Sequence, residues 1–110
     1  MKRAIITVAT LAVFAAASIP AVADDTGAAT MHDLHKEGGR SCMVSHIHAG
    51  TGEGKTKAAA QSAAIKEWYS YTAGEYSSDW ASWGKSAGKK VTYAKAATGW
   101  SSTVESRPCK

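Results

Sequence analysis

The sequence lacks several features that would place it in a common functional class. Its formal net charge is only +4, and Lys2 and Arg3 lie in an N-terminal segment that we expect to be removed. The remaining chain carries 11 Lys and Arg against 9 Asp and Glu, so its net charge is near +2. A charge this small and this evenly scattered argues against a nucleic-acid partner.

Signatures of catalysis are also missing. Serine is plentiful, but no G-x-S-x-G nucleophile elbow occurs. A phosphate-binding loop needs Gly, four residues and then Gly-Lys-Ser/Thr, but Ala49 stands where the GKT at 54–56 would require the first glycine. Glu75 and Asp79 could couple as an acid and a base, although this helical spacing is typical of a solvated face. We therefore predict no catalytic residue and no enzymatic activity.

The sequence has no apolar run long enough to span a membrane. The longest, over residues 4–18, is shorter than the about 20 residues that a spanning helix needs. It follows a basic start, and the sequence AVA at 21–23 fits a signal-peptidase site. We therefore expect residues 1–23 to be a signal peptide and the mature protein to begin near Asp24. The product would be periplasmic or extracellular, with no membrane span.

Cysteine is scarce, since Cys42 and Cys109 are the two in the chain. An exported domain of about 87 residues buries only roughly 60–65% of its unfolded surface, and such domains often gain stability from disulfides. Two cysteines permit one intramolecular pairing. We predict a Cys42–Cys109 disulfide, whose long loop is worth about 4 kcal/mol in the chain-entropy model. Two free thiols or metal-bound thiolates are the alternative.

The mature chain divides into a leader and one domain. Residues 24–41 are polar and show no sustained apolar period, so we expect a flexible leader. Residues 42–110 should form a single domain. Its first segment, 42–48, contains Val and Ile and is bounded by glycines, which predicts a strand. The glycine-rich AGTGEG that follows predicts a turn.

A long helix is predicted from Thr56 onward. Thr56 can cap its first turn, and the Ala-rich KAAAQSAAIKEW has high helix propensity. Large side chains then recur at a mean step of about 3.67 residues, close to the period of a helix, until Gly88 ends the pattern. One long or bent helix, or two consecutive helices, would carry this stripe on one face: Ile65, Trp68, Thr72, Tyr76, Trp80, Trp83 and Ala87.

Two β segments follow the helix, at 89–95 and 100–106, with a hairpin turn between them. A disulfide would bring the start of the first strand to the end of the last if these two strands run antiparallel side by side. We therefore predict an α+β domain with the element order β-α-β-β. Its three-stranded mixed sheet would have the order 1-3-2, with the helix covering one face.

The four histidines, His32, His35, His46 and His48, all lie within 17 residues. His46 and His48 stand two apart on a predicted strand, so their side chains would leave the same face and could share one metal ion. Histidine suits zinc or copper, and a nearby thioether such as Met31 favours copper. No carboxylate stands at an obvious spacing. A structural alternative therefore stays open, in which these are polar residues on the solvent side of a strand.

The run AAIKEWYSYTAGEYSSDWASWGKSA, followed by KKVTY and then GWSSTVESRPC, resembles small uncharacterised exported proteins of bacteria. The shared layout is a tryptophan-bearing helix and a hairpin with a Gly-Trp start and a Pro-Cys end. It covers roughly residues 48–109. The resemblance implies export and fold, and it carries no established activity.

Two functions fit these observations. The first is a non-enzymatic envelope protein that needs no cofactor, is stabilised by its disulfide, and binds an envelope component or a small ligand. The alternative is a periplasmic copper- or zinc-binding protein that uses His46 and His48, with His32 and His35 as further candidate ligands.

Overall fold

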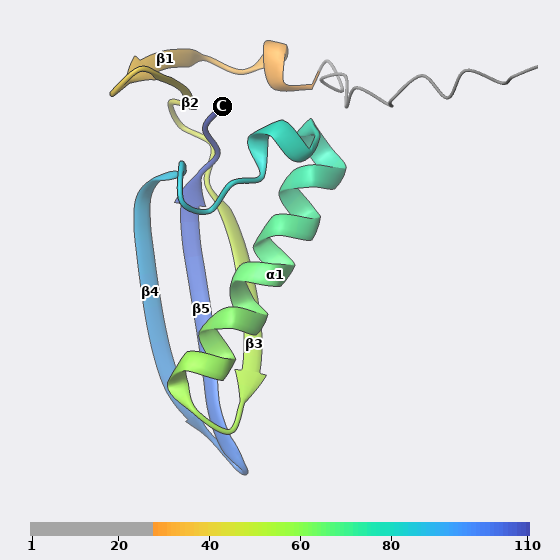
Figure 1. The fold of residues 1–110 in the computed structure, drawn as a ribbon, viewed down its shortest axis with the longest axis vertical. Helices are drawn as coiled ribbons and strands as arrows, with labels where there is room; N and C mark the ends of the chain where they lie inside the picture. The colour runs from red at the N-terminus through yellow and green to blue at the C-terminus, as the bar shows by residue number, and fades with distance from the viewer. Residues whose placement is uncertain (1–27) are drawn as a thin grey trace, which may run out of the picture.

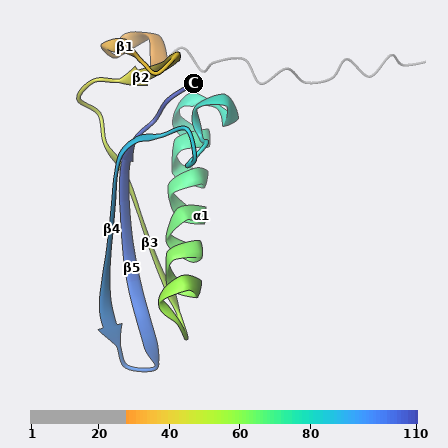
Figure 2. The same ribbon diagram turned by 60° about the vertical axis from the view of Figure 1, so that its left-hand side comes forward.

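The computed structural model describes residues 28–110, which form an α+β fold. The expected signal peptide, 1–23, and residues 24–27 of the expected leader lie outside the described residues. One helix, α1 (Lys57–Tyr76), covers one face of a three-stranded sheet, and a separate two-stranded hairpin lies beyond one end of that sheet (Figures 1 and 2). This helix is not apolar enough to cross a membrane, and the described residues contain no other candidate for a spanning helix.

Strands make up most of the remaining regular structure. The three-stranded sheet has the order β3-β5-β4, while β1 pairs with β2 alone, and every pairing is antiparallel. In chain order these elements and the two 3-10 turns are η1 (Ala29–Met31), β1 (Leu34–Glu37), β2 (Arg40–Met43), β3 (His48–Gly54), η2 (Ser78–Trp80), β4 (Ala87–Ala96) and β5 (Gly99–Arg107).

The α+β class is confirmed, but the predicted single mixed sheet is wrong. The structure has two sheets, and none of their strand pairs is parallel. Within the larger sheet the last strand in sequence, β5, does lie in the centre. It pairs with β3 from His48 opposite Ser106 to Gly54 opposite Trp100. β4 and β3 pair with β5 from opposite sides, and both run antiparallel to it, so this sheet has no parallel neighbours.

The second sheet is a hairpin, most of which lies in residues 24–41, which we expected to form a flexible leader; its last two residues, Cys42 and Met43, belong to the predicted first strand. Gly38 and Gly39 form its turn and adopt positive φ angles of 55° and 80°, which glycine tolerates because it has no Cβ. β1 is largely exposed, so neither of its faces needs apolar residues. The alternation of apolar and polar residues that usually indicates a strand is therefore missing. The hairpin is held instead by its contacts with the C-terminal end of the chain.

The first strand of the main sheet is shifted from its predicted place. We expected a strand at 42–48 and a turn over AGTGEG, whereas β3 runs from His48 to Gly54. Its glycines face α1: a Cβ built on Gly50 would lie 2.2 Å from the Ala64 carbonyl oxygen, and one on Gly52 would lie 2.3 Å from the Ala64 nitrogen. Glycine therefore lets the helix backbone rest directly on the strand, and the GxGxG pattern marks close packing, not a turn.

The helix begins where predicted and ends earlier. Thr56 caps it, since its hydroxyl accepts a hydrogen bond from the Ala59 N–H. The helix ends at Tyr76 because Ser77 takes a φ of 107°, outside the helical region. The stripe predicted to continue on a helix to Gly88 is therefore split, and Trp80 lies in the short turn η2.

The core consists of small apolar clusters. One joins α1 to the sheet through Ala64, Trp68 and Val104, with Ile65, Trp83 and Val91 packed against it. Another joins Ala29 and Met43 from the N-terminal segment to Tyr76 and Trp80. This second cluster seats the N-terminal segment against the end of α1.

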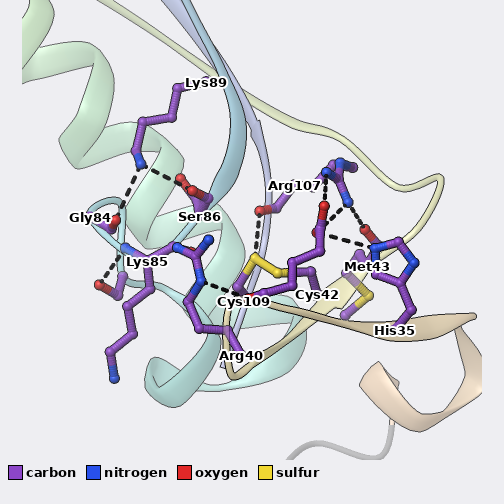
Figure 3. The surroundings of a disulfide bond; sticks show 12 residues. His35, Arg40, Cys42, Met43, Gly84, Lys85, Ser86, Lys89, Arg107 and Cys109 are labelled. Carbon is purple, nitrogen blue, oxygen red and sulfur yellow. Dashed lines mark hydrogen bonds and ion pairs between the residues drawn. A yellow bond between two sulfur atoms is a disulfide. The ribbon is translucent and has the colours of Figure 1, made fainter.

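The predicted disulfide is confirmed, and it fastens the hairpin to the end of β5 (Figure 3). Both Cys42 and Cys109 are fully buried. Beside them, Arg107 donates two hydrogen bonds to the Glu37 carboxylate, at 2.8 and 2.9 Å, and a third to the Met43 carbonyl. The hydrogen bonds from Arg107 lower the pKa of Glu37 to about 2. Charge pairing and a covalent bond thus hold β1 and β2 against the main sheet.

Candidate metal site

Three segments far apart in the sequence bring their side chains together at the C-terminal end of α1. His32 follows η1, His46 lies in the loop between β2 and β3, and Glu75 lies in the last turn of the helix. One ligand atom from each of these three side chains lies within 4.8 Å of the other two. We call His32, His46 and Glu75 the histidine-glutamate cluster.

The orientation of His32 is fixed by two hydrogen bonds. Its Nδ1 lies 2.8 Å from the Ala28 carbonyl oxygen, and because a carbonyl can only accept, Nδ1 carries the proton. Its Nε2 therefore carries no proton, and its lone pair accepts a hydrogen bond from the Tyr76 hydroxyl at 3.2 Å. Burial raises the pKa of Tyr76, which keeps that hydroxyl protonated. The nitrogen available to bind a cation is thus Nε2.

His46 contacts both Glu75 and the other histidine of the cluster. Its Nε2 lies 3.7 Å from Glu75 Oε1, and both side chains are about one-third exposed. Its ring makes edge contacts with the rings of His32, at a centroid distance of 4.7 Å, and of His48, at 4.8 Å. Solvent access and close imidazole rings are compatible with an ion entering from the surface.

His48 lies beneath the cluster and is buried. It stacks on Tyr76 with a centroid distance of 5.0 Å, and its Nδ1 lies 2.8 Å from the Thr72 hydroxyl. Its Nε2 lies 3.1 Å from Glu75 Oε2, but within the described part of the chain that nitrogen has no partner of good hydrogen-bond geometry. Burial lowers the pKa of His48 to about 4, and the nearby Glu75 carboxylate opposes this only in part. His48 is therefore neutral at pH 7.

The protonation of His48 follows from its two neighbours. A carboxylate can only accept, so the ring N–H faces Glu75 and the Thr72 hydroxyl donates to Nδ1. The contact between Nε2 and Glu75 is a short charge–dipole contact, and residues that pack behind a ligand in this way are common in the outer shell of metal sites. His48 thus lies against Glu75, outside the group of three whose ligand atoms converge.

The structure therefore divides the four histidines predicted as metal ligands. His32 and His46 converge, and His48 lies behind them against Glu75. His35 is separate: it lies on β1, is half exposed, and its Nε2 is 3.4 Å from Glu37. The expected pairing of His46 and His48 on one strand is not observed, since His46 precedes β3 and only His48 belongs to it.

The carboxylate of the cluster was not found from the sequence as a ligand. Glu75 stood out there only for its spacing to Asp79, which lies in η2 beyond the end of the helix. A usable signal did exist, because Glu75 directly precedes Tyr76, the last residue of the buried helical stripe. Its position at the helix end becomes informative only when the loop carrying His46 is known to return there.

A second group of potential ligands, Glu37, Cys42 and Cys109, lies at the disulfide. Its two sulfur atoms are bonded to each other, so neither is a thiolate that could bind a cation. The alternative of metal-bound thiolates is therefore wrong in this structure. The thioether of Met43 is buried in the apolar cluster with Tyr76 and Trp80, while Met31 is 86% exposed.

Comparisons with known proteins assign neither a family nor a function to this chain. No protein-family model matches the sequence, and neither the curated proteins nor the solved structures contain a significant match. The functional argument therefore depends on the geometry and chemistry of the cluster itself.

Proposed function

We propose that this protein is a small exported, non-enzymatic module that binds a zinc or copper(II) ion through His32, His46 and Glu75. The observation that carries the proposal is the convergence of three ligand atoms, within 4.8 Å of one another, from three separate segments. Two imidazoles and a carboxylate are a donor set that both ions accept.

The cluster needs only a small adjustment to hold an ion. Donor atoms about 2.0–2.2 Å from a tetrahedral zinc lie roughly 3.3 Å apart. The donor atoms would therefore close by up to about 1.5 Å, and Tyr76 would release the His32 Nε2 that it now contacts. A water molecule or a partner's side chain would complete four-fold coordination.

The surroundings of the cluster support this assignment. The Ala28 carbonyl holds the His32 ring through Nδ1, and the His48 ring packs against Glu75, with its Nε2 3.1 Å from Oε2. Such contacts set the tautomer and orientation of ligands before an ion arrives, which lowers the entropy lost on binding. A purely structural role for these histidines would not require a partly exposed carboxylate in contact with them.

Export remains part of the proposal. The disulfide between Cys42 and Cys109 supports an oxidising compartment, because such bonds rarely persist in the reducing cytosol. An exported protein also meets metal ions that are not held at the very low free concentrations found inside cells. The N-terminal residue of the purified protein, measured by mass spectrometry, tests the expected cleavage before Asp24.

Calorimetric titration of the purified protein with zinc and with copper(II) tests the metal site. We expect one ion per chain with a Kd below about 10 μM, equivalent to about −7 kcal/mol. His46→Ala and Glu75→Gln should each weaken binding by at least about 10-fold, or about 1.4 kcal/mol. His35→Ala is the matched control, since this histidine is close in sequence but outside the cluster, and it should leave affinity unchanged.

Two results would reject the proposal. A Kd above about 10 μM for both zinc and copper(II) would contradict the proposed metal-binding function. Equal losses from His35→Ala and His46→Ala would show that ions bind adventitiously to exposed histidines. Thermal denaturation of each variant without metal separates a lost ligand from a lost fold.

A further inference from the structure

Lysine and aromatic side chains gather at the end of the molecule opposite the histidine-glutamate cluster. The start of α1 and the turn between β4 and β5 meet at this end, whereas the hairpin, the C-terminus and the end of α1 lie at the other (Figure 1). We call this group the basic tip, and it consists of Lys55, Lys57, Tyr93, Lys95 and Trp100.

The lysines of the basic tip are arranged around one indole ring. The Lys57 ammonium lies 4.7 Å from the centre of the Trp100 ring and 5.4 Å from that of Tyr93. The Lys95 ammonium lies 5.3 Å from the Trp100 ring, and these two residues are cross-strand partners. Ring contact draws both charges to one place and leaves their outer hydrogens exposed to solvent.

The hollow beside Trp100 is too small to take a typical organic ligand. Its volume is about 240 Å³, whereas such ligands occupy pockets of about 300–1,000 Å³. Lys55 and Glu53 border the hollow, and the rest of its lining is Trp100 and small residues: Gly54, Ala96, Thr98 and Gly99. The basic tip therefore suits contact with an extended surface better than enclosure of a molecule.

We infer that the basic tip docks on the anionic phospholipid headgroups of a bilayer surface. Three lysines complement the phosphate charge, while Trp100 and Tyr93 are the amphipathic aromatics that favour the headgroup level. Lysine stems can lie along the rings while their ammonium groups reach the phosphates. The histidine-glutamate cluster would then face away from the membrane, and this inference is independent of whether that cluster binds metal.

Flotation with lipid vesicles tests this inference. The purified exported protein is mixed at 50 mM salt with vesicles of phosphatidylcholine, alone or with 30% phosphatidylglycerol. Because each lysine near an anionic surface contributes about a five-fold factor in binding, Lys57→Ala/Lys95→Ala should weaken partitioning about 25-fold. The matched control is Lys66→Ala/Lys90→Ala, which removes the same charge from exposed positions outside the tip and should change partitioning less than about 3-fold.

Docking is supported if three results are all obtained. The protein binds only to the anionic vesicles, and the tip variant selectively loses this binding. Brominated lipids quench the fluorescence of Trp100, and this quenching disappears in Trp100→Phe. Equal losses in the two double variants would overturn it, since net charge alone would then explain binding. Binding to soluble dextran sulfate but not to vesicles would overturn it in favour of a polyanion. Failure of the unmodified protein to bind anionic vesicles would also overturn it. Thermal unfolding confirms that each variant is folded.

Discussion

Gly52→Ala provides a direct test of how the helix meets the sheet. A Cβ at position 52 would lie 2.3 Å from the Ala64 nitrogen and 2.6 Å from the Ala63 carbonyl carbon, where ordinary contacts begin at 3.4 Å. The obstructing atoms are helix backbone, so no side-chain rotation relieves the contact. α1 or β3 must move by about 1 Å, which places the expected loss near the upper end of overpacking effects, about 3 kcal/mol.

Gly74→Ala is the matched control for this prediction. Gly74 is also a glycine of the helix–sheet unit, but a Cβ built there meets nothing within 4 Å. Within a helix, alanine is favoured over glycine by about 0.5–1 kcal/mol. The same substitution should therefore stabilise the protein at position 74 and destabilise it at position 52.

Urea unfolding followed by tryptophan fluorescence measures both effects, since Trp68 is buried between the helix and the sheet. The free energies of unfolding of the two variants should differ by about 3–4 kcal/mol, a large share of the 5–15 kcal/mol typical of a domain. Gly52→Ala should also weaken zinc binding, because α1 carries Glu75. A loss at position 52 below about 0.5 kcal/mol would show that the helix does not rest on the strand.

Three further predictions concern the hairpin and the cluster. Hydrogen bonds from Arg107 lower the pKa of Glu37 to about 2, so the ion pair should stabilise the protein fully above pH 4.5. This stabilisation should be lost progressively as the pH falls toward 2. Acid titration by circular dichroism should show the loss in the native protein and not in Glu37→Gln. Cys42→Ala/Cys109→Ala should lower the free energy of unfolding by about 4 kcal/mol in urea, and an unchanged midpoint would contradict the loop-closure argument. Thr72→Val removes the donor to His48 and should weaken zinc binding about 10-fold by calorimetry, with wild-type affinity counting against an orienting role.

The sequence predicts elements whose signals are local. Thr56 and the alanine-rich run locate the start of α1, and the hairpin of β4 and β5 is found to within two residues at its ends. The disulfide is also predicted, because two cysteines leave one pairing. Each of these depends on neighbouring residues or on counting, and none requires knowledge of the tertiary structure.

The errors arise where tertiary contacts override local preference. The glycines of β3 favour a turn by themselves, and they form a strand because only residues without a Cβ can pass beneath α1. The polar β1 and β2 have no apolar pattern, and their position depends on Arg107, 70 residues away from Glu37. Such a partner is not visible from the spacing of residues along the chain.

The same reasoning explains how the histidines come together. The spacing of His46 and His48 suggested one shared face of a strand, yet His32 comes to the cluster from the segment after η1, whereas His48 lies in β3. It does so because the Asp33 carbonyl accepts from the Val44 N–H, while Cys42, two residues before Val44, is bonded to Cys109. The C-terminal end of the chain therefore fixes the position of the N-terminal ligand. If His32 is a ligand, reducing the disulfide should weaken metal binding even though neither sulfur touches the ion.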